Sequence, residues 1–259
     1  MMFQYDKIYG LLGKKLGHSF SKAYFTEKFL LNNLNYSYQN IELEDISDII
    51  SIVKENDKLK GFNITIPYKE SIIPYLDDID EVAKEVGAVN TVRVDDGKLK
   101  GFNTDVIGFR KLLEKTQRQK DIKTQSFKEA LIFGSGGASK AVQYVLRQEF
   151  IPYKIVSRNV SKLGIRNEEL GMSYDEIDSF DTYSLVINAT PIGMYPNVEE
   201  CLELPYSTVE PHNVFIDLIY NPEETLFLKN ARSNGAATYN GLTMLYEQAE
   251  AAWRVWNNQ

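Results

Sequence analysis

Cysteine and histidine are nearly absent from this sequence of 259 residues, which holds one cysteine, Cys201, and two histidines. A single cysteine excludes an intrachain disulfide framework and a metal cluster built on cysteines. Because histidine and cysteine are also the usual ligands of zinc, we expect no metal site in this chain.

The sequence also lacks an excess of positive charge and a long apolar run. Its 29 Lys and Arg residues stand against 36 Asp and Glu residues, which leaves a net charge of −7. No general basic field is available to hold nucleic acid or an anionic membrane, so any anion must be bound locally. No run approaches the roughly 20 apolar residues of a membrane span, and the N-terminus lacks the apolar stretch of a signal peptide. We therefore expect a small-molecule partner, no nucleic-acid or membrane partner, and a cytoplasmic location.

What the sequence does contain is an ordinary globular composition. Hydrophobic residues make up 43%, charged residues 25% and aromatic residues 12% of the chain, which is far from the composition of disordered proteins. At about 150 residues per domain, the length indicates one large domain or two modest ones.

Apolar runs typical of strands alternate with amphipathic helical stretches in the first hundred residues. The strands are predicted over residues 7–12, 36–43, 59–66, 88–94 and 98–102, and the helices over 21–32, 46–56 and from Pro67 onward. The Asp96-Gly97 pair predicts a tight hairpin turn between the last two strands. We expect this first unit to close near residue 105.

The same alternation returns after a helix predicted over 106–114 and a polar segment, 115–128, that we interpret as a connecting loop. Short apolar runs separated by helical stretches are typical of a parallel sheet. These runs lie at residues 130–133, 154–156, 185–188 and 214–218. A last helix is predicted over 242–256, and its Trp253 and Trp256 are expected to pack in a core.

A glycine-rich turn, Gly134-Ser135-Gly136-Gly137-Ala138-Ser139, follows the first of these apolar runs. Gly134 allows a tight turn, while Gly136 and Gly137 let backbone N–H groups approach a pyrophosphate at the start of the next helix. Ala138 and Ser139 stand where a dinucleotide-binding fingerprint would run on to its third glycine. An ordinary tight turn is therefore the alternative interpretation.

The strand after the glycine turn ends in Ser157-Arg158-Asn159, without the acidic residue that would hold the ribose 2′-hydroxyl of NAD. Arg158 and Lys162 offer instead two cations for a 2′-phosphate. We predict NADP rather than NAD as the cofactor; the alternative is that both side chains are solvated surface charges. A third strand brings Thr190 to the same edge of the sheet, where it would border the nicotinamide ribose.

Small polar residues gather at the predicted strand ends of the first unit. They are Ser19 and Ser21, then Asn63, Thr65 and Lys69, then Asn90, Asn103, Thr104 and Asp105. Two hydroxyls at a helix start can hold a carboxylate, although a helix cap is the alternative for Ser21. Asn63 and Thr65 alternate along a strand and are expected on one face. The apolar residues on the opposite face would be Phe62, Ile64 and Ile66.

Lys69 would lie in the first turn of a helix that begins at Pro67, at the positive end of the helix dipole. A cation is disfavoured there, so we expect this lysine to lose its proton readily and to suit acid and base chemistry on an alcohol and ketone pair. A surface lysine is the alternative, and Asp105 has the alternative of a plain helix cap.

The segments that carry these residues occur in one order along the chain, from residue 17 to 248. They are Gly17-His18-Ser19-Phe20-Ser21, Gly61-Phe62-Asn63-Ile64-Thr65-Ile66-Pro67-Tyr68-Lys69-Glu70, Gly87-Ala88-Val89-Asn90-Thr91, Gly101-Phe102-Asn103-Thr104-Asp105, the glycine turn, Asn188-Ala189-Thr190-Pro191-Ile192-Gly193-Met194, Asp217-Leu218-Ile219-Tyr220-Asn221-Pro222 and Asn240-Gly241-Leu242-Thr243-Met244-Leu245. In these segments the chain resembles the shikimate dehydrogenase family.

The resemblance implies an α/β fold of two domains. An α/β substrate domain would span residues 1–105 and be completed by 239–259, so that the last helix returns to it. A Rossmann-like, doubly wound parallel-sheet domain for NADP would span 106–238. The implied activity is the NADP-linked interconversion of 3-dehydroshikimate and shikimate in the route to aromatic amino acids.

The resemblance also implies roles for individual residues. Lys69 and Asp105 would be the catalytic pair. The substrate would contact Ser19 and Ser21 through its carboxylate, and Asn63, Thr65, Lys69, Asn90, Asp105, Tyr220 and Gln248 through its ring. The cofactor would contact Gly134, Ser135, Gly136, Gly137, Ala138, Ser139, Ser157, Arg158, Lys162, Thr190, Ile219, Gly241 and Met244.

Two features depart from the family pattern, and several alternatives follow. Ser157 stands where the family more often has Asn, and residues 115–128 match no family motif. A quinate/shikimate dehydrogenase with broader substrate or NAD use is the nearest rival, and a catalytically silent NADP-binding regulator is a rival of another class. The oligomeric state is expected to be a monomer or a homodimer.

Overall fold

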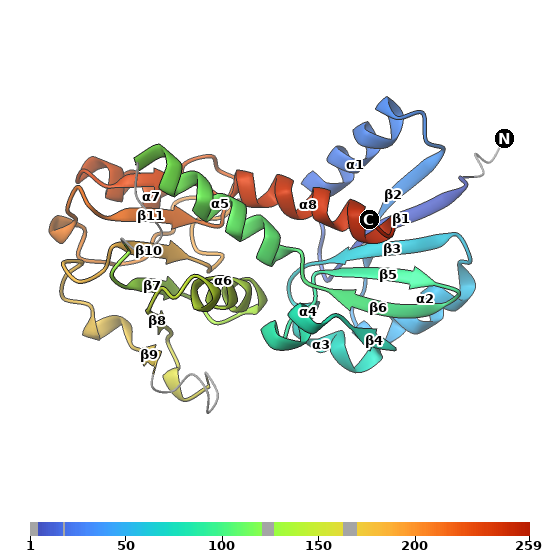
Figure 1. Cartoon of the computed structure of the whole chain (residues 1–259), viewed down its shortest axis with the longest axis horizontal. Helices are drawn as coiled ribbons and strands as arrows, with labels where there is room; N and C mark the ends of the chain where they lie inside the picture. Colours follow the sequence, from blue (N-terminus) through green and yellow to red (C-terminus); the bar gives the residue numbers. More distant parts are fainter. Residues whose placement is uncertain (1–4, 18, 121–126, 163–169) are drawn as a thin grey trace. The chain divides into compact units, whose positions relative to one another are not determined.

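The computed structural model describes residues 5–17, 19–120, 127–162 and 170–259, and the chain is an α/β protein (Figure 1). It forms two compact units. The first unit comprises the chain up to Thr104 together with Ala249–Gln259, and the second comprises Asp105–Gln248. Among the described residues, no helix has both the length and the apolar character that a membrane crossing requires.

The first unit is built on a mixed sheet with the strand order β2-β1-β3-β5-β6-β4. Its strands are β1 (Lys7–Gly13), β2 (Tyr36–Glu42), β3 (Leu59–Ile64), β4 (Asp78–Ile79), β5 (Thr91–Asp95) and β6 (Lys98–Phe102). Strands β1, β2 and β3 are parallel, whereas β5 is antiparallel to both β3 and β6. Asp96 and Gly97 both have positive φ, at 49° and 76°, which confirms the tight hairpin turn predicted between β5 and β6.

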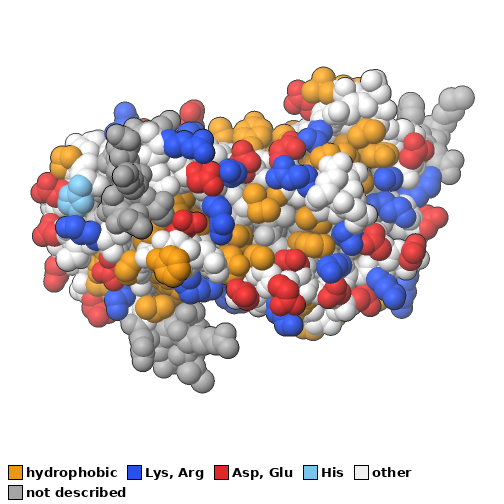
Figure 2. Space-filling model, in the orientation of Figure 1, with side chains coloured by type: hydrophobic (Ala, Val, Ile, Leu, Met, Phe, Trp, Pro, Cys, Tyr) orange, Lys and Arg blue, Asp and Glu red, His pale blue; other side chains and the backbone are white. Residues whose placement is uncertain are grey.

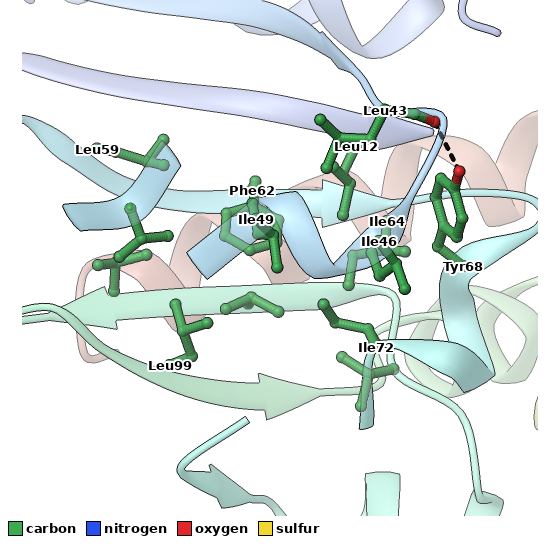
Figure 3. Close-up of a cluster of buried hydrophobic side chains, with 14 of the residues drawn as sticks. Leu12, Leu43, Ile46, Ile49, Leu59, Phe62, Ile64, Tyr68, Ile72 and Leu99 are labelled. Atoms are coloured by element: carbon green, nitrogen blue, oxygen red, sulfur yellow. Dashed lines mark hydrogen bonds between the residues drawn. The ribbon is translucent and has the colours of Figure 1, made fainter. Parts of the chain in front are cut away.

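Short helices connect these strands. They are α1 (Phe20–Leu31), the 3₁₀ turn η1 (Ile46–Asp48), α2 (Ile49–Glu55), α3 (Tyr68–Ser71), the 3₁₀ turn η2 (Ile73–Tyr75) and α4 (Glu81–Val86). On one side of the sheet, Ile46 and Ile49 pack against Phe62 and Ile64 in an apolar core (Figure 3). The hydroxyl of Tyr68 donates a hydrogen bond to the carbonyl of Leu43 over 2.6 Å, which satisfies the polar end of this buried ring.

A second core of the first unit consists almost wholly of aromatic rings. Tyr9, Phe25, Phe29, Tyr38 and Trp256 are its buried ring-bearing members. The ring centroids of Phe25 and Tyr38 lie 4.8 Å apart in a stacked arrangement, and those of Tyr9 and Trp256 are also 4.8 Å apart. The indole N–H of Trp256 donates to the carbonyl of Val92 over 3.0 Å. The predicted core role of the C-terminal tryptophans is confirmed for Trp256, while Trp253 packs against this cluster from a partly buried position.

The second unit is built on a sheet whose described strands are all parallel, in the order β12-β11-β10-β7-β8-β9. The strands are β7 (Ala130–Phe133), β8 (Tyr153–Val156), β9 (Gly171–Met172), β10 (Leu185–Asn188), β11 (Val214–Asp217) and β12 (Ala237–Tyr239). Numbered within this unit, the order is 6-5-4-1-2-3, which is that of a doubly wound dinucleotide-binding sheet. The direction of winding reverses between β7 and β10, so the carboxyl ends of these two strands flank the expected ligand crevice.

Among its described residues, the second unit has the α-helices α5 (Asp105–Lys120), α6 (Gly137–Gln148), α7 (Leu226–Ser233) and the first turns of α8 (Leu242–Trp256), together with short 3₁₀ turns. Side chains from β7, β11 and α7, among them Phe133, Phe215 and Phe227, form its main apolar core. The parallel sheet predicted from the apolar runs is therefore confirmed. The short strands β9 and β12 and the helix α7 have no counterpart among the predicted elements.

The loop predicted over residues 115–128 is wrong in its first part, because α5 continues to Lys120. Thr116 is fully buried and bonds the Leu113 carbonyl, and Glu114 pairs with both Lys111 and Arg118 at helical spacing. Such i,i+3 and i,i+4 ion pairs stabilise the last turns of α5, where residues 114–120 are all polar. A polar segment of this kind shows no apolar periodicity, so the sequence pattern did not indicate a helix there. Residues 121–126 lie outside the described part of the chain.

The strand predicted over 59–66 is also too long. Strand β3 ends at Ile64, and the side chain of Ile66 is 64% exposed. Phe62 and Ile64 do face the core as predicted, but Ile66 does not share their face, because the chain leaves the sheet before it reaches this residue.

Over the face of the molecule that Figure 2 presents, Lys and Arg side chains are interspersed with Asp and Glu side chains. Charges of both signs therefore alternate on this face. A mixture of this kind agrees with the net charge of the chain and supplies no extended basic surface there.

The packing of Gly61 against the C-terminal segment generates a stability prediction. A Cβ at Gly61 would overlap the indole ring of Trp256 and approach the carbonyl oxygen of Val92 to 2.8 Å. We expect Gly61→Ala to lower the free energy of unfolding by about 1–3 kcal/mol, as overpacking does in other cores. At Gly17 the same substitution meets no heavy atom within 4 Å, so Gly17→Ala should change stability by less than about 1 kcal/mol. Urea denaturation of both variants checks this, and equal effects would contradict it.

Candidate functional site

Polar residues of the first unit gather at one edge of its sheet. Because β1 and β3 are parallel, their carboxyl ends meet at this edge. Strand β5 is antiparallel to β3, with Asn63 opposite Thr91, so β5 begins at the same edge. Strand β6 ends there, since Phe102 is opposite Thr91. The topology thus brings together residues that are far apart in the sequence, namely Ser19, Ser21, Asn63, Thr65, Asn90, Asn103 and Thr104.

A chain of buried hydrogen bonds joins these strand ends. The Tyr38 hydroxyl donates to Oδ1 of Asn63 over 2.8 Å, and Nδ2 of Asn63 donates to Oγ1 of Thr91 over 3.0 Å. Thr91 and Thr104 share a hydrogen bond of 3.1 Å between their hydroxyls. Asn90 closes the chain, with Nδ2 3.0 Å from the Thr104 hydroxyl and Oδ1 accepting from the Thr104 amide over 2.7 Å. The two asparagine amides predicted to bind substrate are therefore held in fixed orientations.

Ser19 and Ser21 play different structural parts at the start of α1. Ser19 is the N-cap, and its hydroxyl accepts from the amide of Lys22 over 3.2 Å. Ser21 is 8% exposed and forms a hydrogen bond with Tyr38. Burial raises the pKa of the Tyr38 hydroxyl, and the bond with Ser21 opposes that rise. The cap alternative that we considered for Ser21 is wrong; the cap is its neighbour two residues earlier.

Thr65 and Lys69 follow directly after β3. The Thr65 amide donates to the carbonyl of Leu12 over 2.9 Å, and Lys69 is the second residue of α3. The carbonyl of Lys69 accepts from the amide of Val89 over 2.7 Å, which ties α3 to the residue before Asn90. The helix α3 has only four residues. Since a helix dipole sums over aligned peptide units, the dipole effect that we predicted at Lys69 is weak.

Three further predicted residues belong to the second unit. Asp105 is the first residue of α5 and is 4% exposed. The side chain of Gln248 is buried on α8, and its side-chain amide Nε2 donates to the carbonyl of Leu245 over 3.0 Å. Burial raises the pKa of the Tyr220 hydroxyl. The pairing of Lys69 with Asp105 stays a prediction.

The glycine turn has the local geometry that a tight approach to a ligand requires. Gly134 has a φ of 101°, and its amide donates to the carbonyl of Val156 over 3.0 Å. The hydroxyl of Ser139 donates to the carbonyl of Gly134 over 2.6 Å. Helix α6 begins at Gly137, and a Cβ at Gly136 would meet no heavy atom within 4 Å. Open space over Gly136, beside the amides that begin this 12-residue helix, suits a phosphate group.

Strand β8 places Ser157 and Arg158 on the same edge as the glycine turn, since β7 and β8 are parallel. The Ser157 amide donates to the carbonyl of Met172 over 3.1 Å. Arg158 is exposed. Burial raises the pKa of the Tyr174 hydroxyl, and the positive charge of Arg158 acts in the opposite direction. Lys162 ends the 3₁₀ turn η4 (Val160–Lys162).

The ends of β10 and β11 share a second buried network. Asn188 and Asp217 are paired in register and are both fully buried. Oδ1 of Asp217 accepts from Nδ2 of Asn188 over 3.1 Å and from the amide of Ile219 over 3.0 Å, and its Oδ2 accepts from the hydroxyl of Thr225 over 2.6 Å. Oδ1 of Asn188 accepts from the amide of Thr190 over 3.0 Å and from its hydroxyl over 2.6 Å.

Burial raises the pKa of Asp217 to about 6, and the three hydrogen bonds from Thr225, Ile219 and Asn188 act against this rise. Neither Asp217 nor Tyr38 was among the predicted site residues. Asp217 ends an apolar strand two residues before Ile219 and three before Tyr220, both predicted site residues, and this position is the sequence signal that identifies it. Tyr38 lies inside a strand, where a tyrosine is ordinary, and the sequence carries no comparable signal.

The remaining predicted cofactor residues lie at the start of α8. The Gly241 amide donates to the carbonyl of Ile219 over 3.0 Å. Met244 is 7% exposed, and its carbonyl oxygen would be 2.5 Å from a Cβ at Gly108. The absence of a side chain at Gly108 thus lets α5 and α8 approach closely. Within the described residues, no group of three or more His, Cys, Asp or Glu side chains is arranged to hold a metal ion.

Comparison with known proteins identifies clear relatives. Residues 11–92 match the family model described as the shikimate dehydrogenase substrate binding domain. A shikimate dehydrogenase (NADP(+)) of Methanococcus maripaludis strain C6 is 38% identical over 264 residues, which covers 98% of this chain and 92% of the relative.

Solved structures agree with this result. Shikimate dehydrogenase 1 from Peptoclostridium difficile has a TM-score of 0.83 and 36% identity, covering 98% of this chain and 92% of that one. Shikimate 5-dehydrogenase from Thermus thermophilus, solved in complex with NADP(H) and shikimate, has a TM-score of 0.82 and 28% identity, covering 98% of this chain and 94% of that one.

The buried carboxyl of Asp217 generates a prediction of pH dependence. Its pKa in the folded state, about 6, is above the ordinary value of 3.8, so its contribution to stability is fully present below pH 3.8 and is lost as the pH rises through 6. Relative to Asp217→Asn, the wild-type protein should therefore gain about 2 kcal/mol of unfolding free energy between pH 7 and pH 4. Urea denaturation of both proteins at the two pH values measures the difference. A constant difference would show that the carboxyl titrates alike in the folded and unfolded states.

Proposed function

The chain belongs to the shikimate dehydrogenase family, and we propose that it catalyses the reversible reduction of 3-dehydroshikimate to shikimate with NADPH, in the route to aromatic amino acids. One observation carries the proposal: the similarity to the Methanococcus maripaludis enzyme extends over 98% of this chain. The similarity thus includes both the polar edge of the first unit and the glycine turn of the second.

Shikimate carries one carboxylate and three ring hydroxyls, and the first unit supplies matching groups. Ser19 and Ser21, at the start of α1, are proposed to hold the carboxylate. Neutral donors and acceptors would hold the ring hydroxyls, namely Asn63, Thr65, Asn90 and Gln248. Lys69 and Asp105 would also contact the ring, and Tyr220 would line the pocket. The hydrogen-bond network through Tyr38 supports this assignment, because it presets the amide of Asn63 before any ligand is bound.

The second unit supplies groups for a dinucleotide. The positive φ of Gly134 and the open space over Gly136 support a pyrophosphate site at residues 134–139. Arg158, exposed beyond the end of β8, would bind the 2′-phosphate together with Ser157 and Lys162. Thr190, Ile219, Gly241 and Met244 would contact the nicotinamide end. We therefore propose NADP rather than NAD as the cofactor.

The reaction divides between a hydride and a proton. Bound NADPH supplies the hydride, which is delivered to the carbonyl carbon of 3-dehydroshikimate. The ammonium group of Lys69 gives a proton to the carbonyl oxygen, so that the ketone becomes a secondary alcohol, and Asp105 orients both the lysine and the substrate. In the reverse direction Lys69 accepts the proton of the alcohol.

We place the enzyme in the cytoplasm, as a monomer or a homodimer.

The proposed acid and base roles predict the behaviour of two variants. Lys69→Ala and Asp105→Asn should each lower kcat by about 10²–10⁴-fold, as the loss of general acid and base groups does. The affinity for NADPH should stay nearly unchanged. Steady-state assays of NADP reduction with shikimate, together with NADPH fluorescence titration, measure the two effects. Lys60→Ala, a lysine on β3 whose ammonium bonds the carbonyl of Asp57, is the matched control. Wild-type turnover in both test variants would show that the pair is misassigned.

The proposed phosphate contact predicts a change in cofactor selectivity. Arg158→Gln should raise the KM for NADPH by about 10–100-fold, the equivalent of a lost charged hydrogen bond, and leave the KM for NADH within about 3-fold. Arg147→Gln is the control, because Arg147 bonds the Tyr153 hydroxyl at the opposite end of β8. Equal losses with both cofactors would remove Arg158 from the 2′-phosphate site.

Running shikimate beside quinate in the same assay separates the proposed enzyme from one with broader substrate use.

A further inference from the structure

We propose that Asp217 is a positioning residue that holds two loops of the nicotinamide site, the one that carries Thr190 and the one that carries Ile219. The inference rests on the proposed function, which assigns these two residues to the cofactor. Asp217 has no part in that assignment and lies, fully buried, at the carboxyl end of β11.

The carboxylate of Asp217 acts on its surroundings as a hydrogen-bond acceptor. An ionised carboxyl group accepts hydrogen bonds and donates none. Asp217 therefore requires donors on all sides, and it has three: the amide group of Asn188, the backbone amide of Ile219 and the hydroxyl of Thr225. All three contacts come from residues that begin or flank a loop at the carboxyl end of the sheet.

Asp217 also fixes the orientation of the Asn188 side chain. The side-chain amide of an asparagine can turn over and exchange its oxygen and nitrogen. Because Asp217 accepts from Nδ2, the oxygen of Asn188 faces the other way and receives the amide and hydroxyl of Thr190 over 3.0 and 2.6 Å. The Thr190 hydroxyl accepts in turn from the amide of Ile192 over 3.2 Å. The carboxylate thus sets the conformation of the Thr190 loop without touching it.

The loop that carries Ile219 is held by Asp217 itself. Asp217 binds the amide of Ile219 directly, and the carbonyl of Ile219 accepts from the amide of Gly241 over 3.0 Å. Gly241 immediately precedes α8, which carries Met244 in its first turn. One buried side chain is therefore connected to each of the four residues proposed for the nicotinamide end: directly to Ile219, and through hydrogen bonds or the chain itself to Thr190, Gly241 and Met244.

The surroundings of Asp217 indicate that the carboxylate is not there for stability. It is fully buried, and no Lys or Arg pairs with it among the described residues. An unpaired buried carboxylate disfavours the folded state near neutral pH, as its raised pKa reflects.

Three variants and a fragment of the cofactor test the proposal. Asp217→Leu removes both acceptor oxygens, and we expect it to lower kcat/KM for NADPH by about 10–100-fold, because small displacements of binding groups have effects of this size. Binding of 2′,5′-ADP, which lacks the nicotinamide half, should change by less than about 3-fold on the same scale. Asp217→Asn keeps an oxygen toward Asn188 and Ile219 and can donate to Thr225, so it should restore most of the activity. Thr225→Val leaves both loop contacts in place and should leave kcat/KM nearly unchanged.

Asn213 supplies the matched control. It lies just before β11 at the opposite end of the strand, is fully buried, and donates to the carbonyls of Phe180 and Tyr183. Asn213→Leu should reduce stability without a selective effect on NADPH. If Asp217→Leu does not fold, Asn188→Ala interrupts the link to Thr190 and should show the same contrast between NADPH and 2′,5′-ADP.

The outcomes separate this inference from the proposed function. An equal loss of NADPH and 2′,5′-ADP binding in Asp217→Leu, or unchanged kinetics, would overturn the positioning role alone. Wild-type protein that binds neither NADPH nor 2′,5′-ADP would overturn the proposed function, and the inference with it.

Discussion

A buried polar group must find hydrogen-bond partners, and this requirement governs the functional edge of each sheet. In the first unit, Asn63 has both its amide oxygen and its amide nitrogen engaged, by Tyr38 and Thr91. In the second unit, Asp217 has both oxygens engaged, by donors from three residues. Reversing the amide of Asn90 or Asn188 would place its Nδ2 group against a backbone N–H, of Thr104 or Thr190, so these two amides each have one satisfied orientation. The side chains and loops at these edges are thereby preset before any ligand is bound.

The two edges differ in chemistry in a way that suits their proposed ligands. The network of the first unit consists of hydroxyls and amides, which can exchange hydrogen bonds with the hydroxyls of a ring substrate. The glycine turn of the second unit presents backbone amides at the start of α6, and these favour a phosphate. The only carboxylate in the second network is buried behind its loops, where it acts on the cofactor site through Asn188 and the backbone.

Elements with strong periodicity or strong turn chemistry were predictable from the sequence. The helix predicted over 242–256 matches α8 residue for residue, because its apolar spacing is regular. The Asp96-Gly97 turn and the positive φ of Gly134 follow from local stereochemistry. The end of α5 was not predictable in this way: its last turns are stabilised by ion pairs and by the burial of Thr116, neither of which appears as an apolar pattern. Ile66 was misplaced because the point where β3 leaves the sheet depends on its neighbours.

The sequence by itself determined which residues could do the chemistry, since hydroxyls, amides, one lysine and a glycine turn can be recognised by type and spacing. It also determined the alternation of strands and helices, which follows from local hydrophobic periods. Only the tertiary structure decided that Tyr38 links Ser21 to Asn63 and that Asp217 links Asn188 to Ile219. The physical reason is that these partners come together through the pairing of neighbouring strands, and strand register depends on contacts between residues that are distant in the sequence.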